Sequence, residues 1–130
     1  MIAAAALLAA LYGAPAVRAR ALEPLFAREE REHHLPRGLL AKVARRESMF
    51  RVSAIGDHGR AFGLFQVHSN ALPRTRLTPA QLMRPDVNAH AAALRLVLAR
   101  RRCHGGIAAM WAANFNGRRC GTNPYRIAAR

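Results

Sequence analysis

Apolar residues recur three and four positions apart along much of the chain, a spacing that predicts a mainly helical protein. The first such segment covers residues 22–34 and the second covers residues 38–49. Pro36 lies between them, at a position that a first helical turn tolerates. In the second segment, Glu47 lies one turn beyond the apolar stripe and on the same side. The inward positions expected in the two segments are Leu22, Leu25, Phe26, Glu29 or Glu30, Leu39, Leu40, Val43 and Ala44.

The middle of the chain predicts a loop and one short extended segment. Residues 53–63 hold three glycines and predict the loop, and residues 62–68 predict the extended segment. Next, Thr78, Pro79 and Gln81 have the pattern of a helix start, with Thr78 as N-cap and Gln81 as its reciprocal partner. Leu77 and Leu82 are placed to form the hydrophobic contact that accompanies such a start.

A longer helix is expected over residues 87–102, ended by the glycines at 105 and 106. Its inward positions are expected to be Ala91, Leu94, Val97 and Leu98. Residues 107–114 predict another helix, and Asn123-Pro124 predicts the start of a last one. The fold class expected is therefore mainly α, with a short extended or β-like loop segment.

Residues 1–21 have several features of a secretory signal peptide. Residues 2–12 form an apolar run too short to span a bilayer comfortably, and small residues follow at candidate cleavage positions. No basic residue precedes Arg18, although a signal normally begins with positive charge. The alternative is a buried helix. Residues 22–130 are expected to form one domain, a length sufficient for one hydrophobic core.

The two cysteines, Cys103 and Cys120, predict a disulfide, as suits an exported, periplasmic protein. Such a bridge would stabilise the fold by about 3 kcal/mol. The alternative is two unrelated buried thiols. Neither the cysteines nor the six histidines have the spacing of a metal site, so no metal and no cofactor are expected.

Positive charge dominates the composition, with 21 Lys and Arg against 7 Asp and Glu and a net charge of +14. Lys42 is the only lysine, and a GC-rich genome is one explanation of the bias. The charge favours contact with a polyanion such as nucleic acid, anionic lipid or an anionic cell wall. No nucleic-acid recognition motif accompanies the arginines, so nucleic acid is not the expected partner.

Five short motifs, in order and at compatible spacings, resemble those of the lytic transglycosylases of the SLT type. These are Glu47-Ser48, Gly63-Leu64-Phe65-Gln66, the looser Pro85-Asp86-Val87-Asn88, Phe115-Asn116-Gly117 and Tyr125. The resemblance covers residues 22–130 and implies a monomeric, lysozyme-like domain that cleaves peptidoglycan. It also implies that the protein opens the cell wall locally for a secretion, conjugation or flagellar assembly complex. Phe115 stands where the family usually has tyrosine, which we expect to weaken positioning without abolishing activity.

The resemblance implies that Glu47 is the catalytic acid. Glu47 protonates the glycosidic oxygen, the N-acetyl group of the muramic sugar assists bond cleavage, and Glu47 then takes the C6 hydroxyl proton as a 1,6-anhydro ring closes. The residues expected to support or bind substrate are Ser48, Gly63, Leu64, Phe65, Gln66, Phe115, Asn116 and Tyr125.

Ser48 is expected to hydrogen-bond near the acid or to cap the helix end, Gly63 to let the backbone approach the sugar closely, and Gln66 to contact an N-acetyl group. Phe65 and Trp111 are candidates for stacking on a sugar face. Each of these residues also has a purely structural interpretation. Trp111 is expected to pack in the core rather than to stack on a sugar.

Two other classes remain open on the same fold. A lysozyme-type hydrolase needs two carboxylates flanking the bond, and only Asp57 and Asp86 follow Glu47. Asp57 fits a turn and Asp86 fits a helix start. A glycan-binding module without activity is the second alternative, which the joint presence of Glu47, Gln66 and Tyr125 disfavours.

Overall fold

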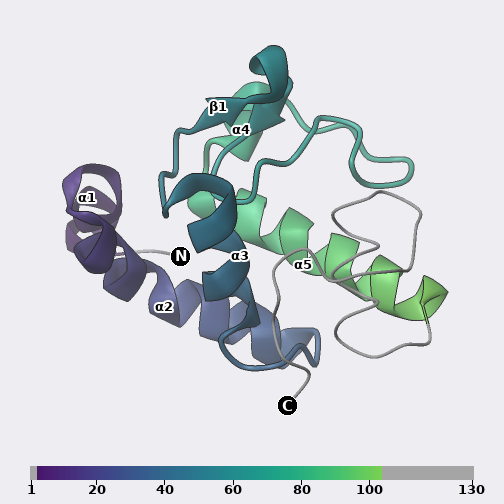
Figure 1. Cartoon of the computed structure of the whole chain (residues 1–130), viewed down its shortest axis with the longest axis horizontal. Coiled ribbons are helices and arrows are strands. Elements are labelled where there is room, and N and C mark those ends of the chain that lie inside the picture. The colour runs from purple at the N-terminus through teal and green to yellow at the C-terminus, as the bar shows by residue number, and fades with distance from the viewer. Residues whose placement is uncertain (1–2, 104–130) are drawn as a thin grey trace. The chain divides into compact units, whose positions relative to one another are not determined.

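The computed structural model describes residues 3–103 of the chain (Figure 1). By its internal contacts the chain divides into two compact units, residues 1–93 and 94–130. The elements in chain order are α1 (Ala4–Tyr12), α2 (Pro15–Glu32), α3 (Leu39–Ser48), β1 (Ile55–Gly56), the 3-10 turn Asp57–Gly59, β2 (Ala61–Phe62), α4 (Pro79–Leu82) and α5 (Pro85–Arg102). The predicted mainly helical class is confirmed. Within residues 3–103, no helix is long and apolar enough to cross a membrane.

The N-terminal segment forms helix α1, which contacts α2. The side chains of Leu8, Leu11 and Tyr12 are 58%, 41% and 82% exposed. Gly13 separates the two helices, and α2 begins at Pro15, well before the predicted start at residue 22. Proline suits that first helical position because its missing N–H has no partner inside the helix.

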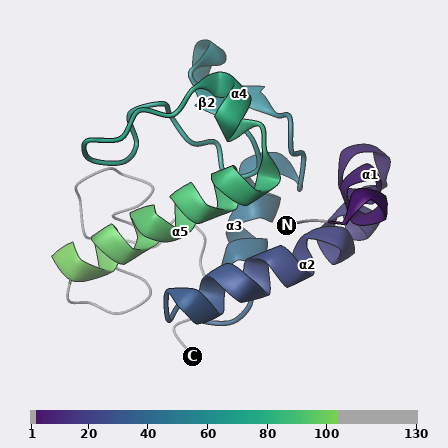
Figure 2. The same cartoon turned by 180° about the vertical axis from the view of Figure 1, so that it is seen from behind.

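The apolar stripes predicted for α2 and α3 form the core of the first unit, where the two helices contact each other (Figure 2). The apolar positions named for them are all buried, as the sequence predicted. The ring of Phe26 on α2 meets the ring of Phe65 edge to face, with centroids 5.5 Å apart and planes at 67°. This geometry is one that aromatic pairs prefer. The core therefore joins α2 to the chain segment that follows β2.

Helix α3 begins on a carboxylate that α2 supplies. Its N-cap is Gly38, which has no side chain to accept hydrogen bonds. The buried Glu30 does this instead: Oε1 accepts from the Gly38 N–H at 3.1 Å and Oε2 from the Leu40 N–H at 2.9 Å. A carboxylate here also meets the positive end of the helix dipole. Glu30 therefore fixes where α3 starts.

Glu30→Gln should lower the free energy of unfolding by about 2–3 kcal/mol, because the amide group turns an N–H₂ toward a buried backbone N–H. Urea unfolding followed by circular dichroism measures the change. Glu23→Gln, on an exposed position of the same helix, is the control and should change stability by less than about 0.5 kcal/mol. Equal effects of the two variants would contradict the capping role of Glu30.

The extended segment predicted over residues 62–68 is wrong. Strand β2 ends at Phe62 and pairs antiparallel with β1, inside the stretch predicted as loop. Residues 63–66 form a turn whose ends are joined by two hydrogen bonds of 3.0 Å between the backbones of Phe62 and Val67. The chain reverses because Gly63 (φ 76°) and Gln66 (φ 50°) both adopt left-handed conformations. We call these four residues the 63–66 turn.

The predicted start of α4 is confirmed. Thr78 Oγ1 accepts from the Gln81 N–H at 3.1 Å, and Gln81 Oε1 accepts from the Thr78 N–H at 2.8 Å. Leu82 is buried and Leu77 is half-buried.

Helix α5 begins at Pro85, two residues before the predicted start, and its inward face differs from the prediction. Ala91 is buried as expected, but Leu94, Val97 and Leu98 are only half-buried. The fully buried positions include Ala89, Ala92, Ala93, Leu96 and Ala99. Apolar residues occur on all sides of this helix, so the sequence pattern does not determine which side faces inward. The glycines at 105 and 106 and the helices predicted beyond residue 103 lie outside the described residues.

Candidate functional site

Glu47 lies in the last turn of α3 and its side chain is half-buried. The helix ends directly after it, because Met49 (φ 53°) and Phe50 (φ 62°) both adopt left-handed conformations. Two such residues in succession are unfavourable by roughly 1–2 kcal/mol each. Burial of the Phe50 side chain, which is 8% exposed, offsets part of this cost. The result is a carboxylate at the end of a short, firmly packed helix.

Ser48 connects the end of α3 to the 63–66 turn. Its buried Oγ donates to the carbonyl oxygen of Leu64 at 2.8 Å and lies 3.2 Å from that of Ala44. The same oxygen accepts from the Arg51 N–H at 3.2 Å. The sequence suggested a bond near the acid or a cap for the helix end. The structure gives the helix-end role and adds a link between two motifs.

The side chains of the 63–66 turn mostly face the interior. Leu64 is fully buried, and Phe65, a candidate for stacking on a sugar, is 5% exposed and packs against Phe26. Gly63 has a positive φ, and a Cβ there would collide with the Asn88 amide and the Leu82 carbonyl oxygen. Close approach of Asn88 is therefore what requires glycine, where the sequence suggested close approach of a sugar.

Gln66 is half-exposed and its amide is partly committed to the backbone. The two protons on Nε2 point to the carbonyl oxygens of Ala54 at 3.2 Å and Gly63 at 3.0 Å. Oε1 lies beside Gly56, where a Cβ would collide with it. The predicted contact of Gln66 with an N-acetyl group would therefore use Oε1, accepting a hydrogen bond from the N–H of the sugar substituent.

The sequence placed Asn88 in the looser family motif but gave it no role in the site. It is fully buried on α5. Its Oδ1 accepts from the Phe65 N–H, and its Nδ2 donates to the carbonyl oxygens of Phe62 and Leu82, all at 2.8 Å. The amide thus joins the 63–66 turn, the end of α4 and the start of α5. A polar residue among the alanines of a helix start was the available signal.

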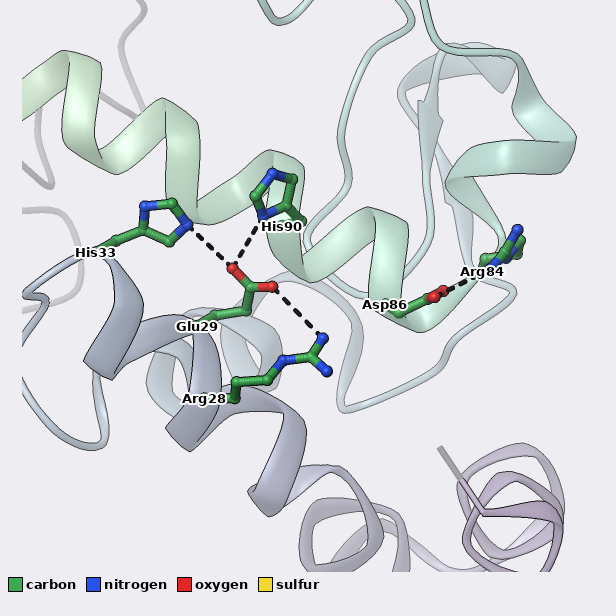
Figure 3. A network of polar contacts seen from close by, with 6 residues as sticks. All are labelled: Arg28, Glu29, His33, Arg84, Asp86 and His90. Carbon is green, nitrogen blue, oxygen red and sulfur yellow. Dashed lines mark hydrogen bonds and ion pairs between the residues drawn. The ribbon is translucent and has the colours of Figure 1, made fainter. Parts of the chain in front are cut away.

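The two aspartates that follow Glu47 both have cationic partners. Asp57 Oδ2 lies 3.1 Å from His68 Nε2, and Oδ1 lies 3.6 Å from the Arg60 guanidinium. Asp86, in the first turn of α5 as predicted, is 3.0 Å from Arg84 (Figure 3). Burial raises the pKa of the Asp86 carboxyl, but the Val87 N–H and the Arg84 guanidinium together outweigh burial and lower that pKa. Asp86 therefore remains ionised at neutral pH.

A pocket of about 380 Å³ lies elsewhere, between α2 and the start of α3. Its lining includes Ala19, Glu23 and Glu30, and none of the residues of the five motifs is among those that line it. Glu30 is already bound to two backbone N–H groups, so it is not available as an acid. The candidate site at Glu47 therefore rests on the family motifs and not on this pocket.

The remaining candidates lie outside the described residues. These are Phe115, Asn116, Tyr125, Trp111 and Cys120. Cys103 directly follows α5 and is 4% exposed. The disulfide between the two cysteines stays a prediction.

Comparison with known families agrees with this arrangement. The family model of the transglycosylase SLT domain matches residues 24–124, most of the chain. The chain therefore belongs to the SLT transglycosylase domain family, whose fold is lysozyme-like and whose substrate is peptidoglycan. Comparison with curated proteins and with solved structures finds no match.

Asn88→Ala should lower the free energy of unfolding by about 3 kcal/mol, because the buried Phe65 N–H and the Leu82 carbonyl oxygen lose their Asn88 partner. The Phe62 carbonyl oxygen keeps only its bond from the Val67 N–H. Urea unfolding measures this, and Asn70→Ala, at an exposed position, is the control. If Asn88→Ala is no less stable than Asn70→Ala, the amide does not hold the 63–66 turn.

Proposed function

We propose that this protein is a peptidoglycan lytic transglycosylase in which Glu47 serves as both acid and base. The observation that carries the proposal is the hydrogen bond from Ser48 to the Leu64 carbonyl oxygen. Through this bond and those of Asn88, three motifs of the family form one buried network beside a half-buried carboxylate. Such a network fixes the end of the helix that carries Glu47, and a fixed position of the acid favours proton transfer to a bound sugar.

The reaction needs one proton carrier. Glu47 donates its proton to the glycosidic oxygen, and the N-acetyl group of the muramic sugar assists as the C–O bond breaks. The Glu47 carboxylate then accepts the proton of the C6 hydroxyl, whose oxygen bonds to C1. The proton returns to Glu47, and the ring closes without water.

The other carboxylates support this single-acid mechanism. Asp57 makes an ion pair with Arg60 and Asp86 with Arg84, so both aspartates have structural roles of their own. Glu29 and Glu30 are buried on α2 with partners of their own. Glu23 and Glu32 are exposed on the same helix, as expected for solvated surface charges. Glu47 is the carboxylate that the motifs and the geometry together favour.

The protein is proposed to work in the periplasm after removal of residues 1–21. The family match begins at residue 24, just beyond the predicted signal. A disulfide between Cys103 and Cys120 suits that compartment. The net charge of +14 favours an anionic cell wall. We propose local wall opening for a secretion, conjugation or flagellar machine as the biological role.

Glu47→Gln should fold normally and lose nearly all activity on purified sacculi, because an amide has no proton to give. Release of soluble muropeptides, measured by chromatography, gives the rate. Glu32→Gln, a matched change at an exposed position, should retain wild-type turnover.

Retention of more than a few per cent of the rate in Glu47→Gln would remove Glu47 as the acid. If wild type and variant both bind sacculi and neither releases muropeptides, the protein is a glycan-binding module.

The products should carry 1,6-anhydromuramic ends, because the C6 hydroxyl of the substrate takes the place of water. Mass spectrometry of digested sacculi separates these from hydrolytic products, which are heavier by one water molecule. Asp57→Asn should give the same products at most of the wild-type rate, since Asp57 is paired with His68 and Arg60. Reducing-end products together with an inactive Asp57→Asn variant would instead identify a two-carboxylate hydrolase.

A further inference from the structure

A carboxylate and two imidazoles meet where α2 approaches the start of α5, within the first unit (Figure 3). Oε2 of Glu29 lies 3.2 Å from Nε2 of His33 and 3.0 Å from Nδ1 of His90. The two rings have centroids 5.4 Å apart. None of the three residues has a part in the proposed reaction, and the histidine spacing along the sequence did not reveal this cluster.

The backbone holds the three side chains in this position. Glu29 lies in the last turn of α2, and His33 is the C-cap residue directly after the helix, whose N–H donates to the Glu29 carbonyl oxygen at 3.1 Å. His90 lies two residues beyond Asn88, whose buried hydrogen bonds fix the start of α5. The Arg28 guanidinium lies 3.8 Å from Oε1 of Glu29, leaving Oε2 directed at both rings. An outer partner of this kind orients a carboxylate ligand.

We propose that Glu29, His33 and His90 bind a divalent transition-metal ion, with Zn²⁺ as the ion that the donors fit. Two imidazoles and one carboxylate are a common protein ligand set for zinc, whereas Ca²⁺ and Mg²⁺ prefer oxygen donors throughout. The three ligand atoms lie within 4.8 Å of one another. Tetrahedral bonds of about 2.0–2.1 Å separate neighbouring ligand atoms by about 3.3 Å, so the two distances from Glu29 Oε2 to the imidazoles already fit. The two ring nitrogens lie within 4.8 Å of each other and must approach by up to about 1.5 Å, which rotation of the half-exposed His90 side chain allows.

The site is open to solvent on one side. Glu29 has 3% of its side chain exposed and His33 18%, but His90 has 50%. The ion therefore enters past His90, and a water molecule completes the coordination as a fourth ligand. A bound ion joins α2 to the first turns of α5, the same turns that carry Asn88. Because the ion binds the folded chain, it raises stability by an amount that grows with the logarithm of the free ion concentration above its Kd.

Calorimetric titration of Zn²⁺ into the metal-free, untagged protein tests the proposal. One equivalent should bind and should raise the thermal unfolding midpoint. His90→Gln, at the most exposed ligand, should weaken Zn²⁺ binding at least tenfold and abolish the metal-dependent rise. His58→Asn is the control, because His58 is exposed on the 3-10 turn and is not among the three ligands. It should bind Zn²⁺ as the wild type does.

Two results would overturn the proposal. Failure of the wild type to bind Zn²⁺ would leave a hydrogen-bonded cluster and no metal site. Equal affinity of His90→Gln and wild type would place the bound ion on other residues. His33→Gln is a second ligand variant and should match His90→Gln, so a folding defect in one variant does not decide the outcome.

Discussion

Three hydrogen bonds to one buried amide, that of Asn88, hold together the parts of the chain on which the candidate site depends. The amide bonds the Phe65 N–H of the 63–66 turn and the Leu82 carbonyl oxygen at the end of α4, and it gives a second hydrogen bond to the Phe62 carbonyl oxygen, which also accepts from Val67. Burying such groups unpaired is unfavourable by about 1–3 kcal/mol each, so the turn is stable only when α5 supplies Asn88. The same amide requires glycine at position 63, because a side chain there would displace it.

This dependence changes what the family motifs mean physically in this chain. Leu64 contributes its carbonyl oxygen to Ser48, and Phe65 contributes its N–H to Asn88, while both side chains fill the core. The motif around the turn therefore serves first to support the end of α3. In the proposed reaction, chemistry is assigned to Glu47 and contact with substrate to the exposed part of Gln66.

Features that depend on neighbours in sequence were predictable, and those that depend on distant partners were not. The capping box at Thr78 and the apolar stripe of α3 are local patterns, and both are confirmed. The sequence predicted an extended segment where the 63–66 turn lies. The local pattern could not show the reversal, because the turn is held by Asn88, more than twenty residues away. For the site, the motif around Glu47 was visible in sequence, but the commitment of Gln66 to backbone carbonyls required the folded structure.

The buried carboxylates of α2 show how one helix can organise two others. Glu30 fixes the start of α3, which ends at Glu47, and Glu29 meets His90 at the start of α5, which carries Asn88. Sequence placed one of these two acids inward without saying which, because consecutive helical positions differ by about 100° in direction. Both are buried because each has its own partners. Helix α2 thus positions the helix that carries the acid and contacts the helix that supports the turn beside it.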